Sequence, residues 1–282
     1  MPESRLQTQP LEGKRVLVTR TREQAASLSV SLKEAGAIPL ELPVIRIVPP
    51  SDWQPLDQAL RMLIEARTYD WLIFTSVNGV KMVLERLQAL NLASSGLHGV
   101  RIATIGPATA SALEQYGLSA TLVPDEYIAE SVARALRKED LQGQRILLAR
   151  AAEARQVLIT ELEQAGAIVD VVTAYRTLPV DQNDERANEV LTLLRQHKLD
   201  ILTFTSSSTV HHFMNWLEQS ASDIADLLRH PVKQESSPLI ACIGPITAST
   251  ARSYGLEVNI EAQKFTIAGL VGALIDYEVT SK

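Results

Sequence analysis

The chain has 282 residues, of which 46% are hydrophobic, and a formal net charge of -6. This is enough material for one large domain or for two ordinary domains with proper cores. The negative charge gives no long-range attraction for nucleic acid or for an anionic membrane, so neither is expected as a partner. An anionic ligand must then be held by local backbone amides and a few arginines.

The first twelve residues contain Pro2, Glu3 and Pro10 and no apolar run. They are predicted to form a loose polar arm, which is neither a signal peptide nor an arginine-rich transit segment. No apolar stretch approaches the roughly twenty residues that a membrane helix needs. The one cysteine, Cys242, lies in an apolar run, which favours a core position and a reducing compartment. We expect a cytoplasmic monomer.

Strands and helices are predicted to alternate along the chain. The first strand is expected at Val16 to Thr19, and the helix after it has apolar residues at positions 25, 28, 32 and 35. Strands that are apolar throughout and alternate with helices indicate parallel sheets that are covered on both faces. The fold class is therefore α/β.

The sequence is internally duplicated. Residues 13–20 (GKRVLVTR) are echoed 130 positions later by residues 143–150 (GQRILLAR), and DWLIFTS at 70–76 by DILTFTS at 200–206. Further on, residues 102–110 return as residues 240–248, now 138 positions apart. The eight added residues are placed in the polar stretch from Ser220 to Pro238, which is predicted to be a surface loop. Each half should form a small doubly wound unit.

The later repeat contains a Gly-Pro turn, at Gly106 in the first half and at Gly244 in the second. Thr109 and Thr247 follow these turns and are predicted to cap helices that begin one residue later. A glycine turn with outward-pointing helix amides suits an anion such as a carboxylate or a phosphate. Two such turns predict a ligand with many anionic groups.

The distinctive residues follow strands, and ligands of doubly wound sheets lie beyond the carboxyl ends of the strands. The Thr-Ser hydroxyls could simply cap helices, but finding them with an arginine on the same edge in both halves favours ligand binding. We expect two rims that face a shared cleft. The candidate binding residues are Arg20, Ser76, Asn78, Gly79, Thr109, Arg150, Thr205, Ser206, Ser207, Gly244 and Thr247.

Tyr175 breaks the duplication. Its partner 130 positions earlier is Ile45, although the next residues, Arg46 and Arg176, match. A phenol with a pKa of about 10 stays protonated at neutral pH and can donate a proton or a hydrogen bond to a departing hydroxyl. The alternative is a packed ring with its hydroxyl in water.

Several chemistries lack their usual residues. His211 and His212 are adjacent and point to different helix faces, and no carboxylate or cysteine stands at ligand spacing, so no metal site is expected. The chain contains no P-loop, no GxGxxG and no Gly-x-Ser-x-Gly. No cofactor is predicted.

Six motifs occur in order between about Gly13 and Tyr277: Val-Leu-Val-Thr-Arg, Phe-Thr-Ser-x-Asn-Gly-Val, Ile-Gly-x-x-Thr-Ala, Ala-Tyr-Arg-Thr, Phe-Thr-Ser-Ser-Ser-Thr-Val and Ile-Gly-Pro-x-Thr-Ala. In their order, spacing and duplication they resemble the uroporphyrinogen-III synthase family. One departure is Thr21, where the family often has proline.

The resemblance implies two flavodoxin-like, doubly wound parallel-sheet domains joined by a two-stranded β ribbon. Residues 1–43 and 178–282 would form the first domain, residues 47–172 the second, and residues 43–47 and 172–178 the ribbon. Without the resemblance, two consecutive domains would fit the pattern equally well.

The implied reaction takes the linear tetrapyrrole hydroxymethylbilane, expels its terminal hydroxyl as water and closes the ring with the last pyrrole inverted, without a metal or organic cofactor. In the implied sequence, loss of the hydroxyl gives an azafulvene, attack on it gives a spiro intermediate, and fragmentation with re-closure gives uroporphyrinogen III. By the same resemblance Tyr175 aids hydroxyl departure, and Thr109 and Thr247 position the substrate. The resemblance also implies substrate contacts at Ser76, Asn78, Ser206 and Ser207.

Two other functions remain open, because a fold alone does not fix a function. The chain could be a non-catalytic sensor that closes on a tetrapyrrole or another polyanion, or a different lyase or transferase for a multiply charged metabolite. Turnover distinguishes them, since an enzyme would give the type III isomer and a mere binder would leave the spontaneous type I product.

Overall fold

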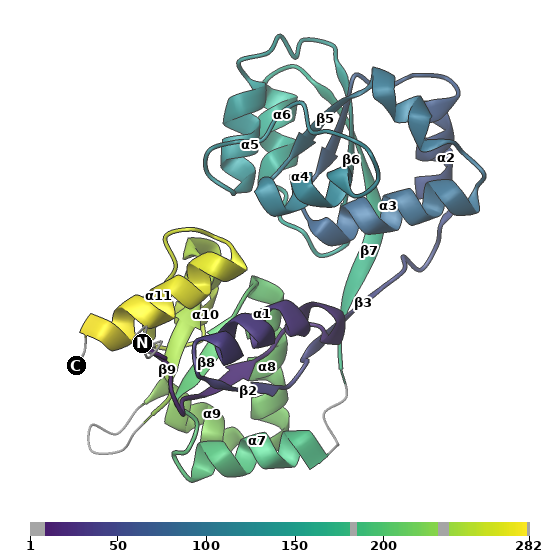
Figure 1. Cartoon of the computed structure of the whole chain (residues 1–282). Coiled ribbons are helices and arrows are strands. Elements are labelled where there is room, and N and C mark those ends of the chain that lie inside the picture. The colour runs from purple at the N-terminus through teal and green to yellow at the C-terminus, as the bar shows by residue number, and fades with distance from the viewer. Residues whose placement is uncertain (1–8, 181–184, 231–236, 281–282) are drawn as a thin grey trace, which may run out of the picture. The chain divides into compact units, whose positions relative to one another are not determined.

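The computed structural model describes residues 9–180, 185–230 and 237–280. The chain divides into two compact units, which we call unit 1 (Met1–Arg46 with Leu178–Lys282) and unit 2 (Ile47–Thr177). It therefore passes from one unit to the other twice, at the Arg46–Ile47 and Thr177–Leu178 junctions. Figure 1 shows the elements of both units.

Unit 1 has a five-stranded sheet in the order β10-β9-β8-β1-β2, and all its strand pairs are parallel. Its strands are β1 (Arg15–Val18), β2 (Ile38–Glu41), β8 (Ile201–Phe204), β9 (Leu239–Cys242) and β10 (Val258–Glu261). Its helices are α1 (Arg22–Glu34), α7 (Glu185–Arg195), α8 (Ser207–Ser220), α9 (Ser222–Arg229), α10 (Pro245–Ser253) and α11 (Ile267–Thr280).

Alternate strand residues of unit 1 enter two separate cores. Leu17 of β1 packs with residues of α7, α8, α9 and α10. Val16 and Val18 pack instead with α1 and α11. Since successive side chains of a strand point to opposite faces, these helix groups cover opposite faces of the sheet, as the uniformly apolar strands predict.

Unit 2 has a sheet in the order β3-β7-β6-β4-β5, and its pairs β7-β6, β6-β4 and β4-β5 are parallel. Its strands are β3 (Ile45–Val48), β4 (Trp71–Phe74), β5 (Arg101–Thr104), β6 (Arg145–Ala151) and β7 (Ile168–Pro179). Two residues of β3 and two of β7 lie in the chain segments assigned to unit 1. Helices α2 (Gln54–Ile64), α3 (Val77–Ala89) and α4 (Pro107–Glu114) cover one face, and α5 (Ala129–Leu136) and α6 (Val157–Gln164) the other. A short 3-10 helix, η1 (Ser94–Gly99), joins the first group.

Equivalent contacts recur in the two units. In unit 1 the Asp200 carboxylate accepts the Arg15 backbone N–H at 2.8 Å. In unit 2 the Asp70 carboxylate accepts the Arg145 backbone N–H at 2.9 Å. Thus β1, from the first half of the sequence, pairs with β8 from the second half, while β6 from the second half pairs with β4 from the first. Each unit combines segments of both sequence halves.

Two loop predictions were wrong in part. Leu11, in the predicted polar arm, is fully buried against the α1 and α11 core, because its backbone N–H is tied to the Ala35 carbonyl at 2.9 Å. Residues 1–8 of that arm lie outside the described residues. The stretch from Ser220 to Pro238 contains helix α9, which buries Ile224 and Leu228 in the core, and residues 231–236 of the stretch lie outside the described residues.

The predicted core positions of Cys242 and of three residues of α1 are confirmed. Cys242 is a fully buried core residue, and burial raises the pKa of its thiol to about 12. In α1, Ala25, Leu28 and Leu32 are buried as their spacing predicts.

None of the helices in the described part of the chain is long and apolar enough to cross a bilayer. The described residues also contain no group of three or more His, Cys, Asp or Glu that could hold a metal ion.

Candidate functional site

The carboxyl end of the unit 2 sheet brings Tyr175 and Ser76 together. Tyr175 lies near the end of β7 and is only 7% exposed, and its ring packs in the core under α2, α3 and α4. Its hydroxyl lies 2.9 Å from the Ser76 Oγ. The ring is therefore packed in the core, as the alternative expects, while its hydroxyl makes a polar contact within the protein.

Ser76 has a second role as the N-cap of α3. Its Oγ accepts the Gly79 backbone N–H at 3.0 Å, which satisfies one of the free amides of the first turn. A side chain at Gly79 would approach the Ala149 carbonyl of β6 to 3.3 Å, so the glycine lets α3 start close to the sheet. Capping of α3 thus fixes the position of the Ser76 hydroxyl beside Tyr175.

The surroundings of Tyr175 keep its phenol protonated. Burial raises the pKa of Tyr175, and the nearby Glu153 carboxylate raises it further, whereas hydrogen bonds from the Ser76 and Asn78 side chains lower it. Glu153 is anchored beside β7, since its Oε2 accepts the Thr177 backbone N–H at 3.2 Å. A phenol with a raised pKa is a hydrogen-bond donor over the whole neutral range.

Arg150 faces inward at the same strand end. It is 5% exposed, and its guanidinium donates to the carbonyls of Ala154 at 2.6 Å and Arg155 at 2.8 Å. Burial lowers the pKa of Arg150. These bonds hold the loop after β6 that carries Glu153, so the observed contacts of Arg150 are structural ones.

Arg20, at the matching position of unit 1, has different contacts. Its Nη2 donates to the Gln24 Oε1 at 3.2 Å, and burial lowers its pKa. Its Nε is buried, and the described residues offer that atom no hydrogen-bond acceptor. Arg20 therefore has a buried donor that the described residues leave unsatisfied, whereas the Arg150 guanidinium donates to two backbone carbonyls.

The Thr-Ser loop of unit 1 also caps its helix. The Ser206 Oγ accepts the Thr209 backbone N–H at 3.2 Å. The Thr209 Oγ1 in turn accepts the Ser206 backbone N–H, which completes a capping box. Ser207 bonds the Thr250 hydroxyl of α10 at 2.8 Å. Thr205, between β8 and this cap, is partly exposed.

The prediction that Thr109 and Thr247 cap helices was wrong. Helices α4 and α10 begin at Pro107 and Pro245, two residues before the threonines, because proline is favoured in the first helical position. The threonines lie within the first turn, 3% and 5% exposed, and neither helix has a side-chain cap. The amides of these first turns are therefore left without a side-chain cap.

Aromatic residues that sequence reasoning missed pack on both Gly-Pro turns. A Cβ at Gly106 would lie 2.9 Å from the Tyr127 ring, and one at Gly244 would lie 2.8 Å from the Phe265 ring. The two rings are 138 positions apart, as the two glycines are. That shared offset is the signal that could have found them.

A family model described as uroporphyrinogen-III synthase HemD matches residues 26–272, which is most of the chain. The chain belongs to the uroporphyrinogen-III synthase family.

Two relatives of this family match over nearly their full length. A uroporphyrinogen-III synthase of Synechococcus elongatus is 36% identical over 94% of this chain and 96% of its own. A putative uroporphyrinogen-III synthase of Methanothermobacter thermautotrophicus is 30% identical over 91% of this chain and 96% of its own.

Solved uroporphyrinogen III synthases share the α/β fold. A mutant enzyme from Thermus thermophilus has a TM-score of 0.63 at 19% identity and covers 96% of this chain and 100% of its own. The Helicobacter pylori enzyme has a TM-score of 0.54 at 16% identity, with 94% and 99% covered.

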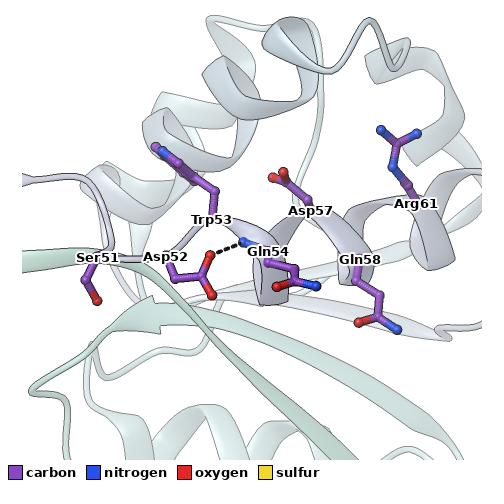
Figure 2. A pocket seen from close by; sticks show the side chains of 7 residues that line it. All are labelled: Ser51, Asp52, Trp53, Gln54, Asp57, Gln58 and Arg61. Carbon is purple, nitrogen blue, oxygen red and sulfur yellow. Dashed lines mark hydrogen bonds between the residues drawn. The ribbon is translucent and has the colours of Figure 1, made fainter.

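A surface hollow at the start of α2 contains none of the candidate binding residues, and its charged side chains pair within the protein. Figure 2 shows the Asp52 carboxylate accepting the Gln54 backbone N–H, at 2.8 Å, with Asp57 and Arg61 further along the helix. Asp57 is held by Arg86 through two bonds of 2.6 Å. The charges of this hollow are thus largely used within the protein.

Proposed function

We propose that this chain is a uroporphyrinogen-III synthase that cyclises hydroxymethylbilane to uroporphyrinogen III with loss of water and inversion of the terminal pyrrole ring. The observation that carries the proposal is the Tyr175 hydroxyl, held 2.9 Å from Ser76 at the carboxyl end of the unit 2 sheet, in a chain of this family. A protonated phenol at that position suits a reaction that begins with departure of a hydroxyl.

Tyr175 is assigned the first step. Its O–H donates a hydrogen bond to the terminal hydroxyl of the substrate, which weakens the carbon–oxygen bond. The hydroxyl leaves as water, and the pyrrole N–H gives up one proton as the azafulvene forms. Ser76 and Asn78 orient the phenol, because both side chains hydrogen-bond it. The following spiro and ring-closing steps need the substrate to be held in one conformation, which is a positioning task.

Carboxylate recognition is assigned to the free donors at the strand ends. Arg20 retains a buried Nε without an acceptor among the described residues, and α4 and α10 start without side-chain caps behind Gly106 and Gly244. Helix N-terminal amides and guanidinium groups both suit carboxylates. The other candidates, Gly79, Thr109, Arg150, Thr205, Ser206, Ser207 and Thr247, stay proposed binding residues.

The units are further proposed to be two flavodoxin-like domains that arose by duplication and are joined by a ribbon of β3 and β7. Unit 1 read from β2 has the order 2-1-3-4-5 typical of flavodoxin-like sheets. The repeated Asp-to-strand contacts of Asp70 and Asp200 support a common origin. A cytoplasmic monomer fits the single buried cysteine, and sedimentation of the purified protein measures its mass in solution.

The isomer ratio tests the function. Purified protein mixed with hydroxymethylbilane should give mainly uroporphyrinogen III, measured after oxidation by chromatography of the two porphyrin isomers. A product that is mainly type I, as in a mixture without protein, would mean that the chain binds without catalysing and would leave the sensor as the better proposal.

We predict that Ser76→Ala loses about 1 kcal/mol of stability with its helix cap and also lowers kcat, because Tyr175 loses its hydroxyl partner. Thr266→Ala is the matched control, since Thr266 caps the start of α11 through the Gly269 N–H at 3.0 Å and is not among the proposed binding residues. Urea unfolding and steady-state kinetics on both variants check this. Equal kcat in the two variants would reduce Ser76 to a cap.

A further inference from the structure

One hollow in unit 1 is lined by three arginines. Its volume is about 200 Å³, and its lining residues all belong to unit 1. They are Arg22, Glu23, Leu42, Pro43, Ile45, Arg46, Val180 and Arg186. We call it the arginine hollow.

The arginine hollow has an apolar floor and a charged rim. Leu42 and Ile45 are buried and form part of the core under the sheet, whereas Arg22 and Arg46 are exposed. Arg22 begins α1, and Leu42 directly follows β2. The hollow therefore lies at the carboxyl end of a parallel strand, the edge at which ligands of such sheets bind.

The rim carries an excess of positive charge. Three arginines face one glutamate, although the whole chain has a net charge of -6. Within the described residues, none of the three guanidinium groups forms an ion pair with a carboxylate. Like charges in excess over the neighbouring counter-charges raise the local potential and attract an anion.

The size of the hollow limits the ligand. Pockets for drug-sized molecules span about 300–1,000 Å³, so about 200 Å³ admits one short arm rather than a whole macrocycle. A floor of Leu42 and Ile45 with guanidinium groups above it matches a short aliphatic chain that ends in a carboxylate.

We propose that the arginine hollow binds one carboxylate-ended side arm of a polycarboxylate ligand, with Arg22 and Arg46 as its charged contacts. The identity of that ligand as the tetrapyrrole substrate rests on the proposed function. Arg186 is the weaker contact, because it also lines an adjoining hollow that contains Glu41 and Glu189.

The hollow of Figure 2 supplies a matched control. It too has an exposed arginine, Arg61, but Asp52 and Asp57 accompany it, and Arg61 forms its own ion pair with Glu65 at 3.7 Å. Arg61→Gln therefore removes the same charge from the chain without removing it from a cationic hollow.

The test uses the full chain and uroporphyrin I, an eight-carboxylate porphyrin, as the probe, with binding followed by its fluorescence at low and at high salt. Arg22→Gln and Arg46→Gln are each expected to raise Kd about three- to tenfold at low salt, and the double variant more, with smaller effects at high salt. Arg46→Lys should retain much of the affinity, and Arg61→Gln should bind as the unchanged chain does. In turnover, KM for hydroxymethylbilane should rise by similar factors while kcat stays within about twofold.

A double variant that binds uroporphyrin I as tightly as the unchanged chain overturns the proposal, as does an equal loss in Arg61→Gln or an absence of binding by the unchanged chain. Failure of the proposed function looks different. In that case the unchanged chain binds the porphyrin through Arg22 and Arg46 but yields the type I isomer, and the arginine hollow stands as a polycarboxylate site.

Discussion

Tyr175→Phe is expected to lower kcat about 100-fold while the protein stays folded. The substitution removes only the hydroxyl, and the ring remains in the core beneath α2, α3 and α4. The departing substrate hydroxyl then loses its donor, and the Ser76 Oγ loses its 2.9 Å partner. Turnover of hydroxymethylbilane with separation of the two isomers measures the effect, and thermal unfolding shows whether the fold is kept.

Tyr69→Phe is the control for this experiment. Tyr69 is 6% exposed in the same core, and burial together with Asp170 raises the pKa of its hydroxyl to about 12. It precedes β4, at the opposite end of the sheet from Tyr175. Tyr69→Phe should cost stability but leave kcat in place, whereas similar kinetics in the two variants would return Tyr175 to a packing role.

The same contacts predict the pH dependence of turnover. The protonated phenol is the active form, and burial and Glu153 raise the pKa of Tyr175 above the ordinary value of about 10. Loss of rate from ionisation of Tyr175 should therefore begin only at a pH above that value. A fall in kcat between pH 7 and 9 that disappears in Tyr175→Phe would contradict this.

Gly244→Ala is expected to destabilise the protein by about 2 kcal/mol, because the added methyl group would lie 2.8 Å from the Phe265 ring and would displace it. The backbone at Gly244 is extended, so the cost comes from crowding and not from backbone strain. Urea unfolding measures the loss. A rise in KM is also expected, since the ring holds the turn that leads into α10.

Gly272→Ala shows what the same change does where there is room. Gly272 lies in α11 and a Cβ there would meet no atom within 4 Å. Alanine is the better helix former, so a gain of about 0.5–1 kcal/mol is expected. If both variants lose similar stability, crowding at Phe265 is not the cause.

The strands and their parallel pairing could be predicted from the sequence, because uniformly apolar runs such as Val16 to Val18 and Trp71 to Phe74 leave few other placements. The starts of α4 and α10 were missed, although Pro107 and Pro245 mark them. The threonines were predicted as caps. They cannot fill that position, because each helix already begins at the proline two residues before its threonine.

The different contacts of Arg20 and Arg150 could not be predicted from the duplication. Arg20 lies two residues after β1 and Arg150 is the next-to-last residue of β6, but only Arg150 is followed by a loop whose carbonyls, at Ala154 and Arg155, turn back onto the guanidinium. Such contacts depend on the path of a loop, which apolar periodicity does not report. The Tyr175 contact with Ser76 was beyond reach for the same reason, since it joins residues 99 positions apart.

The exchange of segments between the sequence halves has a consequence for synthesis on the ribosome. Unit 2 is continuous in the chain and is complete once residue 177 has emerged. Strand β1, made before unit 2, can pair early with β2 but must wait for β8, 185 positions further on, to obtain its second neighbour. Since domains fold as units during translation, unit 2 is expected to fold first. The segment with β1 and β2 stays exposed to chaperones until β8 has been made.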